Sequence, residues 1–179
     1  MIFKETRLKG SYIIELEKIA DERGFFSRAW CQKEFQSHGL NPNVAQCNLS
    51  HNNLKGTLRG IHFQIAPYEE AKIVRCISGQ IYDVIVDLRP ESPTYLQWLG
   101  LELSSTNRKM IYVPENFAHG YLTLADHTEV FYQVSQLYAP GSESGIRWDD
   151  PALRIKWPRF DNLIISEKDQ SWPFVKAQT

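Results

Sequence analysis

The stretch from Lys72 to Leu88, KIVRCISGQIYDVIVDL, decides the fold class of this 179-residue chain. Apolar and β-branched residues fill both halves of it, in short runs that are typical of buried strands. Ser78-Gly79 separates the halves and favours a tight turn, so we expect strands at 72–77 and 80–88, joined as a β-hairpin. Asp83 and Asp87 interrupt the second run, and carboxylates there need partners or water.

Similar short runs recur on both sides of this stretch. Turn-forming residues separate them, as in RPESP at 89–93 and APGS at 139–142. Helical patterning is confined to 32–37 and to one turn near 166–169. Many short strands and almost no helix predict an all-β fold, and their spacing favours a jelly roll. The other predicted strands are 12–16, 44–50, 57–64, 97–103, 109–113, 120–124 and 128–135.

Composition narrows the kind of protein. The length and a hydrophobic content of 42% favour one globular domain, 1–179, whose irregular tail after 151 should cover the barrel mouth. A net charge of −1 without long Lys/Arg runs argues against nucleic-acid binding. The chain has neither an N-terminal apolar segment nor an 18-residue apolar stretch, so we expect no secretion signal and no membrane partner. Three cysteines without CxxC spacing fit a reducing cytoplasm.

The predicted strand 57–64 contains LRGIHFQ, which holds three polar residues in an otherwise apolar segment. By strict alternation His62 and Gln64 lie on one face and Arg59 on the other. His62 is either a structural histidine or a base. If Arg59 and His62 line the same pocket, the strand must bulge at Gly60, where the missing side chain removes the steric cost.

Lys72 and Tyr132 also have two interpretations each. Lys72 follows Glu69-Glu70, so it forms either a solvated charge pair or a fixed ammonium inside the barrel that stabilises an oxyanion. Tyr132 is either a packing residue or a proton donor placed opposite a base.

A metal site is a weaker alternative. Cupin barrels hold a metal with an HxH, Glu, His arrangement, which falls here on His62, Gln64, Glu70 and His119. Gln64 is a poor ligand for zinc or iron, so we expect no metal.

Several motifs, in order along the chain, resemble the dTDP-4-dehydrorhamnose 3,5-epimerase family. The resemblance runs from about residue 3 to 175. The motifs are DERGFF at 21–26, QCNLS at 46–50, LRGIHFQ at 58–64, AK at 71–72, DVIVDLRPESPT at 83–94, PENFAHG at 114–120 and WDDPALRIKWP at 148–158.

This resemblance implies a cupin-type jelly-roll barrel, usually a homodimer, that uses neither a metal nor an organic cofactor. The implied substrate is a nucleotide-linked 4-keto-6-deoxy sugar, whose C4 ketone acidifies the protons on C3 and C5. Inversion at either carbon then needs only proton removal from one face and return to the other.

The family's residue roles carry over by position. His62 matches the base and Asp169 the carboxylate that orients it, while Lys72 matches the lysine beside the ketone. Tyr132 matches the proton donor on the opposite face. The substrate-contacting positions are Arg23, Gln46, Asn48, Arg59, His119, Glu143, Lys168 and Tyr138, the last of which stacks on the nucleotide base.

Two positions depart from the family pattern. Arg28 stands where many members have a substrate-contacting glutamate, which leaves the nucleotide base and the sugar open. Asn116 stands where glycine is common, and asparagine tolerates left-handed geometry. The alternatives are inversion at one carbon only, another activated sugar, a non-catalytic sugar-binding barrel, or a metal-dependent cupin dioxygenase.

Overall fold

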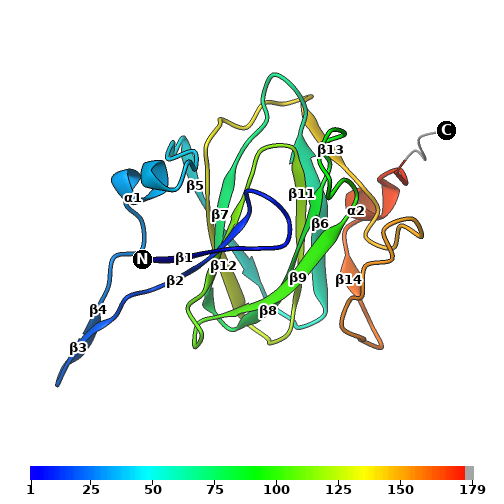
Figure 1. The fold of residues 1–179 in the computed structure, drawn as a ribbon. Coiled ribbons are helices and arrows are strands. Elements are labelled where there is room, and N and C mark those ends of the chain that lie inside the picture. The colour runs from blue at the N-terminus through cyan, green and yellow to red at the C-terminus, as the bar shows by residue number, and fades with distance from the viewer. Residues whose placement is uncertain (176–179) are drawn as a thin grey trace.

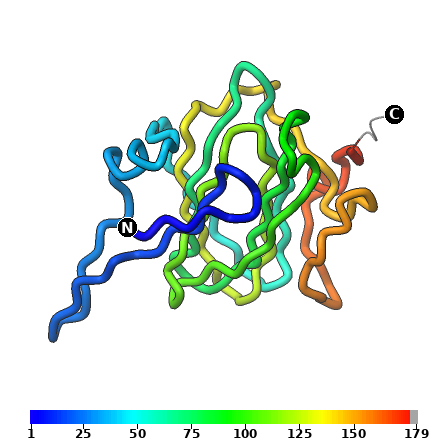
Figure 2. The backbone as a smooth tube through the Cα atoms, in the orientation of Figure 1, coloured from blue at the N-terminus to red at the C-terminus, as the bar shows by residue number. Residues whose placement is uncertain are grey.

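The computed structural model describes residues 1–175 and consists mainly of strands, which form two facing sheets and a separate hairpin (Figure 1). The last four residues of the predicted single domain, 176–179, lie outside the described residues. Within the described part, no helix is long and apolar enough to cross a membrane. Between residues 46 and 145 most successive strands lie in opposite sheets, and the tube in Figure 2 follows this path.

Each sheet has six strands, all antiparallel except for one pair. The first sheet runs in the order β1 (Ile2–Glu5), β2 (Tyr12–Glu15), β10 (Met110–Val113), β7 (Lys72–Ser78), β12 (Thr128–Val134) and β5 (Gln46–Asn52). The second runs β13 (Glu143–Gly145), β6 (Thr57–Gln64), β11 (Phe117–Thr123), β8 (Gln80–Asp87) and β9 (Trp98–Ser104), with β14 (Ile164–Ile165) parallel to β6. The separate hairpin pairs β3 (Ile19–Asp21) with β4 (Gly24–Phe26).

This architecture confirms the predicted all-β, cupin-type fold. All nine predicted strands are present, as are the two helical segments, α1 (Gln32–Ser37) and α2 (Glu167–Ser171). Five strands have no counterpart in the prediction: β1, β3, β4, β13 and β14. Each has two to four residues, too few for a periodic pattern to be recognised.

The predicted hairpin across Ser78-Gly79 is wrong. β7 pairs with β10 and β12 in the first sheet, whereas β8 pairs with β11 and β9 in the second. The turn at Gly79, with a φ of 75°, therefore carries the chain from one sheet to the other. Both strands have an apolar inner face, including Val74 and Ile85, and facing sheets bury these side chains against each other in the core.

The outer faces of both sheets are partly covered. On the first sheet, Phe35 of α1 packs against Ile14 and Ile73. On the second, the C-terminal tail places Trp157 against a cluster that includes Val84. The tail thus covers the back of a sheet rather than the whole barrel mouth, and α2 alone reaches the opening between the sheets (Figure 1).

Both aspartates of β8 are fully buried and each is hydrogen-bonded, although Oδ1 of Asp83 has no partner among the described residues. Asp83 accepts a hydrogen bond from His119. Burial would raise the pKa of the Asp87 carboxyl, but hydrogen bonds from Arg89, Ser92 and Thr94 outweigh it and lower the pKa to about 2. The Asp87 network fixes the loop that joins β8 to β9.

Candidate active site

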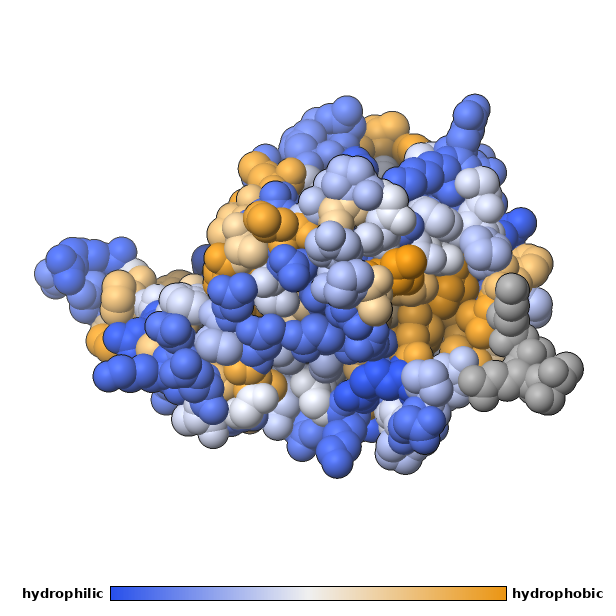
Figure 3. All heavy atoms as spheres, turned by 90° about the horizontal axis from the view of Figure 1, so that it is seen from above, coloured by the Kyte–Doolittle hydropathy of each residue, from blue (hydrophilic) through white to orange (hydrophobic). Residues whose placement is uncertain are grey.

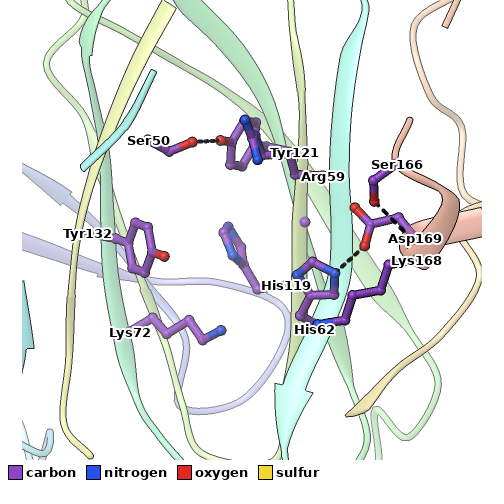
Figure 4. A pocket seen from close by; sticks show the side chains of 11 residues that line it. Ser50, Arg59, His62, Lys72, His119, Tyr121, Tyr132, Ser166, Lys168 and Asp169 are labelled. Carbon is purple, nitrogen blue, oxygen red and sulfur yellow. Dashed lines mark hydrogen bonds and ion pairs between the residues drawn. The ribbon is translucent and has the colours of Figure 1, made fainter. Parts of the chain in front are cut away.

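A cleft opens between the two sheets at the end where α2 lies (Figure 4). It consists of two adjoining hollows of about 300 and 430 Å³, which share His62, Lys72 and Tyr132. The first also contains Asp169, and the second extends to Tyr138. Together they have the size of a small-molecule site.

An interruption in β6 places two candidate residues in this cleft. Arg59 lies opposite Tyr121 of β11 and His62 lies opposite His119, with a register shift between the two pairs. Gly60 has a φ of 118°, and a Cβ there would lie 2.6 Å from the Cα of Gly120. The predicted bulge is therefore confirmed, and it brings Arg59 and His62 to the same cavity.

The side chain of His62 is paired with that of Asp169. Its Nε2 lies 2.6 Å from Oδ1 of Asp169, whose Oδ2 accepts the backbone N–H of Gly60 at 3.2 Å. Burial would raise the pKa of Asp169, but the bonds from His62 and Gly60 outweigh it and lower the pKa. A carboxylate can only accept, so Nε2 of neutral His62 carries the proton and Nδ1 keeps its lone pair.

The C-terminal tail delivers Asp169 to this position. β14 pairs in parallel with the start of β6, where Ile165 lies opposite Leu58. Ser166 then caps α2, because its Oγ accepts the backbone N–H of Asp169 at 3.1 Å. The ring of Trp172, which ends the helix, approaches that of His62 edge-on.

Lys72, at the start of β7, lines the cleft and is largely shielded from solvent. Its Nζ is 3.0 Å from Oε1 of Glu70, and the two side chains are only 10% and 11% exposed. The charge pair suggested by the sequence therefore exists, but inside the barrel. A partly desolvated ammonium at this place interacts more strongly with a developing negative charge than an exposed one would.

Tyr132 reaches into the cleft from β12, on the wall opposite His62 (Figure 4). Burial raises the pKa of its phenol, and the nearby Tyr121 and Glu70 raise it further. The hydroxyl therefore keeps its proton at neutral pH and can donate it.

His119 lies between Tyr132 and His62 (Figure 4) and belongs to a second histidine–aspartate pair. Nε2 of His119 is 2.8 Å from Oδ2 of Asp83, and both residues are buried. His119 was predicted from the sequence as a substrate contact, but Asp83 was not predicted as its partner. Asp83 shares the inward face of β8 with Ile81 and Ile85, and this alternation was the available signal.

A polar network that was not predicted from the sequence lies beside Arg59. Oδ1 of Asn52 accepts a hydrogen bond from Nε of Arg59 at 2.8 Å. The hydroxyl of Tyr121 bonds to Ser50 at 2.8 Å and accepts from Asn52 at 3.4 Å. Because Asn52 engages only Nε, the two terminal nitrogens of Arg59 remain available for an anion.

The larger hollow, of about 430 Å³, is the outer hollow. Gln46 and Asn48 of β5 line it together with Tyr138 and Glu143, whereas Lys168 lines the first hollow. Lys168 donates to Oε2 of Glu143 at 2.6 Å, and the Tyr138 hydroxyl donates to the same oxygen at 3.2 Å. Burial would raise the pKa of Glu143, but Lys168 outweighs it and lowers the pKa. The Tyr138 ring is 57% exposed and stands at the opening.

Arg23 and Arg28 are not brought to this cleft. Arg23 lies in the turn of the β3–β4 hairpin, which projects away from the barrel (Figure 1), and its 84% exposed side chain pairs with Asp21. The side chain of Arg28 is 62% exposed and pairs with Glu34. Neither residue lines the cleft of its own chain, so their substrate contacts stay predictions.

The cupin metal positions are used in other ways. His62 and His119 each pair with an aspartate, and the Gln64 amide bonds to backbone groups. Among the described residues, no group of three or more His, Cys, Asp or Glu side chains is placed to hold a metal ion. Asn116 adopts left-handed geometry, with a φ of 61°, as its replacement of glycine implied.

Comparison with known proteins agrees with this geometry. The family model described as dTDP-4-dehydrorhamnose 3,5-epimerase matches residues 5–177. A dTDP-4-dehydrorhamnose 3,5-epimerase of Methanothermobacter thermautotrophicus is 47% identical over 95% of this chain and 92% of its own. The crystal structure of an enzyme of this name from Elizabethkingia anophelis is 39% identical, covers 97% of this chain and 96% of its own, and has a TM-score of 0.94. Another from Bacillus anthracis, with TDP and PPi bound, is 39% identical, covers 97% and 100%, and has a TM-score of 0.92. This chain therefore belongs to the dTDP-4-dehydrorhamnose 3,5-epimerase family and is an epimerase.

Proposed function

We propose that this protein epimerises a nucleotide-linked 4-keto-6-deoxy sugar at both C3 and C5, converting dTDP-4-dehydro-6-deoxy-D-glucose to dTDP-4-dehydro-L-rhamnose. One observation carries the proposal: a base paired with a carboxylate, His62–Asp169, and a protonated phenol, Tyr132, face the same cleft from opposite walls (Figure 4). Inversion of a carbon requires this opposed arrangement, because the proton leaves one face and returns to the other.

In the proposed mechanism, His62 removes a proton from the carbon beside the C4 ketone. The Asp169 carboxylate holds the imidazole in one tautomer and stabilises the imidazolium that forms. Lys72 lies near the developing enolate oxygen, and one such charged donor is typically worth about 3–4 kcal/mol in the transition state. Tyr132 then returns a proton to the opposite face. These steps transfer only protons, so they require no redox cofactor.

The outer hollow is the proposed nucleotide site. Tyr138 would stack on the base beside Gln46 and Asn48, which line the same hollow. Arg59 and Lys168 would hold the diphosphate, so that a chain of net charge −1 binds an anion through local cations.

We further infer a homodimer in which the β3–β4 hairpin of one subunit serves the cleft of the other. Ile19 and Phe26 of this hairpin are each 71% exposed, and in the view from above the hairpin projects from the body at the left (Figure 3). β5 is an edge strand whose Gln46 and Asn48 line the cleft. A hairpin lying along this edge from a second copy would bring Arg23 to the opening.

The outer face of the first sheet supports the same dimer. Leu49 of β5, which is 59% exposed, lies opposite Phe131, and Phe131 lies opposite Arg75. The guanidinium of Arg75 stacks on the Phe131 ring, while its buried Nε has no hydrogen-bond partner in the part of the chain that the structure describes. A second copy would cover this apolar row.

We also infer that the protein works in the cytoplasm. Cys31, Cys47 and Cys76 are all free thiols, one exposed, one half-buried and one buried. Reducing compartments maintain thiols in this state.

The test is incubation of the protein with the dTDP-, CDP- and GDP-linked 4-keto-6-deoxy sugars in heavy water, followed by NMR. We expect deuterium at both C3 and C5, most rapidly with the dTDP sugar. Deuterium at one carbon only would indicate a mono-epimerase. Preference for another nucleotide would point to Arg28 as the residue that changes nucleotide specificity. Absence of exchange with every sugar would contradict the proposed function.

A further inference from the structure

We propose that Gln64 is a positioning residue whose side-chain amide couples the nucleotide end of the cleft to Lys72. The inference rests on the proposed function, since it holds that Gln64 supports both Tyr138 and Lys72, which act on different parts of the substrate. Gln64 ends β6 and is 4% exposed. Its amide lies between the segment that holds Tyr138 and the carboxylate that holds Lys72.

The orientation of this amide is fixed by its neighbours. Oε1 accepts the backbone N–H of Ala139 at 2.9 Å, and a backbone N–H can only donate. Nε2 therefore faces three acceptors: the carbonyls of Tyr68 and Leu137, at 3.0 and 3.3 Å, and Oε2 of Glu70 at 3.4 Å. A side chain without both an acceptor and N–H donors could not make this set of contacts.

At the nucleotide end, the amide holds the backbone on both sides of Tyr138. It bonds to the carbonyl of Leu137 and to the N–H of Ala139, while Gln46 accepts the N–H of Tyr138 itself at 2.6 Å. The Tyr138 ring is more than half exposed, so little packing fixes it. Its position over the cleft therefore depends on these backbone anchors, together with the hydrogen bond from its hydroxyl to Glu143.

At the ketone end, the amide acts through Glu70. One carboxylate oxygen of Glu70 faces Nε2 of Gln64, and the other lies 3.0 Å from Nζ of Lys72. A glutamate held at one oxygen presents the other in a defined place, which in turn positions the ammonium. The amide thus supports Lys72 indirectly, through Glu70.

The strand itself does not depend on this side chain. Gln64 pairs through its backbone with Glu143 of β13, and the next residue, Ile65, donates its N–H to the carbonyl of Ser142. Loss of the amide should therefore leave the sheet intact and disturb the two groups that it anchors.

The experiment compares Gln64→Met with Tyr138→Ala, Glu70→Ala and the two double variants. Calorimetric titration with dTDP reports on the nucleotide end, and deuterium incorporation at saturating substrate reports on the Lys72 end. We expect Tyr138→Ala to weaken dTDP binding alone and Glu70→Ala to slow exchange alone. Gln64→Met should weaken dTDP binding and slow exchange, each by about tenfold. When added to Tyr138→Ala it should not weaken binding further, and when added to Glu70→Ala it should not slow exchange further.

Gln80→Met is the matched control, because Gln80 also donates to a glutamate on a neighbouring strand, Glu102, but away from the cleft. It should bind dTDP and exchange deuterium as the wild type does. If circular dichroism shows that Gln64→Met does not fold, Gln64→Glu enters the same cycle, since it keeps the shape and the acceptor but has no N–H.

The inference is overturned if a folded Gln64 variant changes only one of the two readouts, or neither of them. It is also overturned if adding the Gln64 substitution to Tyr138→Ala or Glu70→Ala lowers dTDP affinity or exchange as much as it does in the wild type. If the Gln64 variant changes neither readout while the wild type is fully active, the proposed function is still supported. A wild type that neither binds dTDP nor exchanges deuterium would instead remove the proposed function, and this inference with it.

Discussion

At the scale of single residues, the chemistry depends on pairs rather than on isolated side chains. His62 and His119 each contact an aspartate, and Lys72 contacts a glutamate. In each pair the carboxylate fixes the orientation of the group that it contacts. The cleft therefore holds groups that can exchange protons without large rearrangement.

Replacement of His62 by alanine tests the base. We expect deuterium incorporation at both C3 and C5 to fall by a factor of at least about 10³, because general bases typically contribute 10²–10⁴-fold. NMR in heavy water measures the exchange. His38→Ala is the control, since His38 stacks on Phe3 away from the cleft. Undiminished exchange in His62→Ala would show that another group is the base.

Replacement of Tyr132 by phenylalanine separates proton removal from proton return. Exchange should survive better than complete inversion, because His62 can still take a proton and deliver deuterium to the same face. NMR measures exchange and product in the same sample. Equal loss of both would count against Tyr132 as the donor.

The lowered pKa of Asp87 predicts that the stability of the fold depends on pH. Its pKa falls from 3.8 to about 2 on folding, so its network stabilises the fold fully above pH 4. This contribution, about 2 kcal/mol, is lost as the pH falls from about 4 towards 2. Urea unfolding at several pH values should therefore show a shallower decline below pH 4 for Asp87→Asn than for the wild type. Parallel declines would contradict the assignment.

At the scale of elements, the bulge in β6 decides which side chains reach the cleft. A regular strand would leave Arg59 on the opposite face from His62. The close approach of β6 and β11 at Gly60 and Gly120 permits the register shift. β14 then pairs beside this site and fixes the start of α2.

Gly60→Ala tests this arrangement. An added Cβ would meet the backbone of Gly120 at 2.6 Å, and we expect a loss of more than about 2 kcal/mol of unfolding free energy. Gly39→Ala is the matched control, because Gly39 also has a positive φ, of 70°, but open space around it, and should cost only about 1–2 kcal/mol. Urea unfolding measures both, and equal costs would show that the close contact is unimportant.

At the scale of the whole molecule, the two predicted arginines that lie outside the cleft point to assembly. Within residues 1–175, the hairpin that carries Arg23 makes its strand pairs only within itself. An isolated two-stranded hairpin is marginally stable in water, so a second copy is the expected support.

A subunit-mixing experiment tests whether Arg23 acts across the dimer. Arg23→Ala and His62→Ala should each be nearly inactive, but unfolding and refolding them together should restore about a quarter of the sites. In the mixed dimer one cleft would receive an intact His62 from its own chain and an intact Arg23 from the other. Light scattering establishes the dimer, and absence of any recovery would show that Arg23 does not act in trans.

The sequence by itself determined the nine longer strands, the family and most of the candidate site. Alternation and turn residues are local properties, so they located nine strands and both helical segments. Motif resemblance selected His62, Lys72, Tyr132 and Asp169, which the fold brings to one cleft.

Only the tertiary structure decided which strands pair and which side chains meet. The chain crosses between sheets at Gly79 and not through a hairpin, because two apolar faces bury more surface when they face each other. Asp83 as the partner of His119, and the hydrogen bonds of Gln64 to Leu137 and Ala139 on either side of Tyr138, depend on contacts between distant parts of the chain. A local pattern does not contain such contacts, since they arise only when the sheets close on each other.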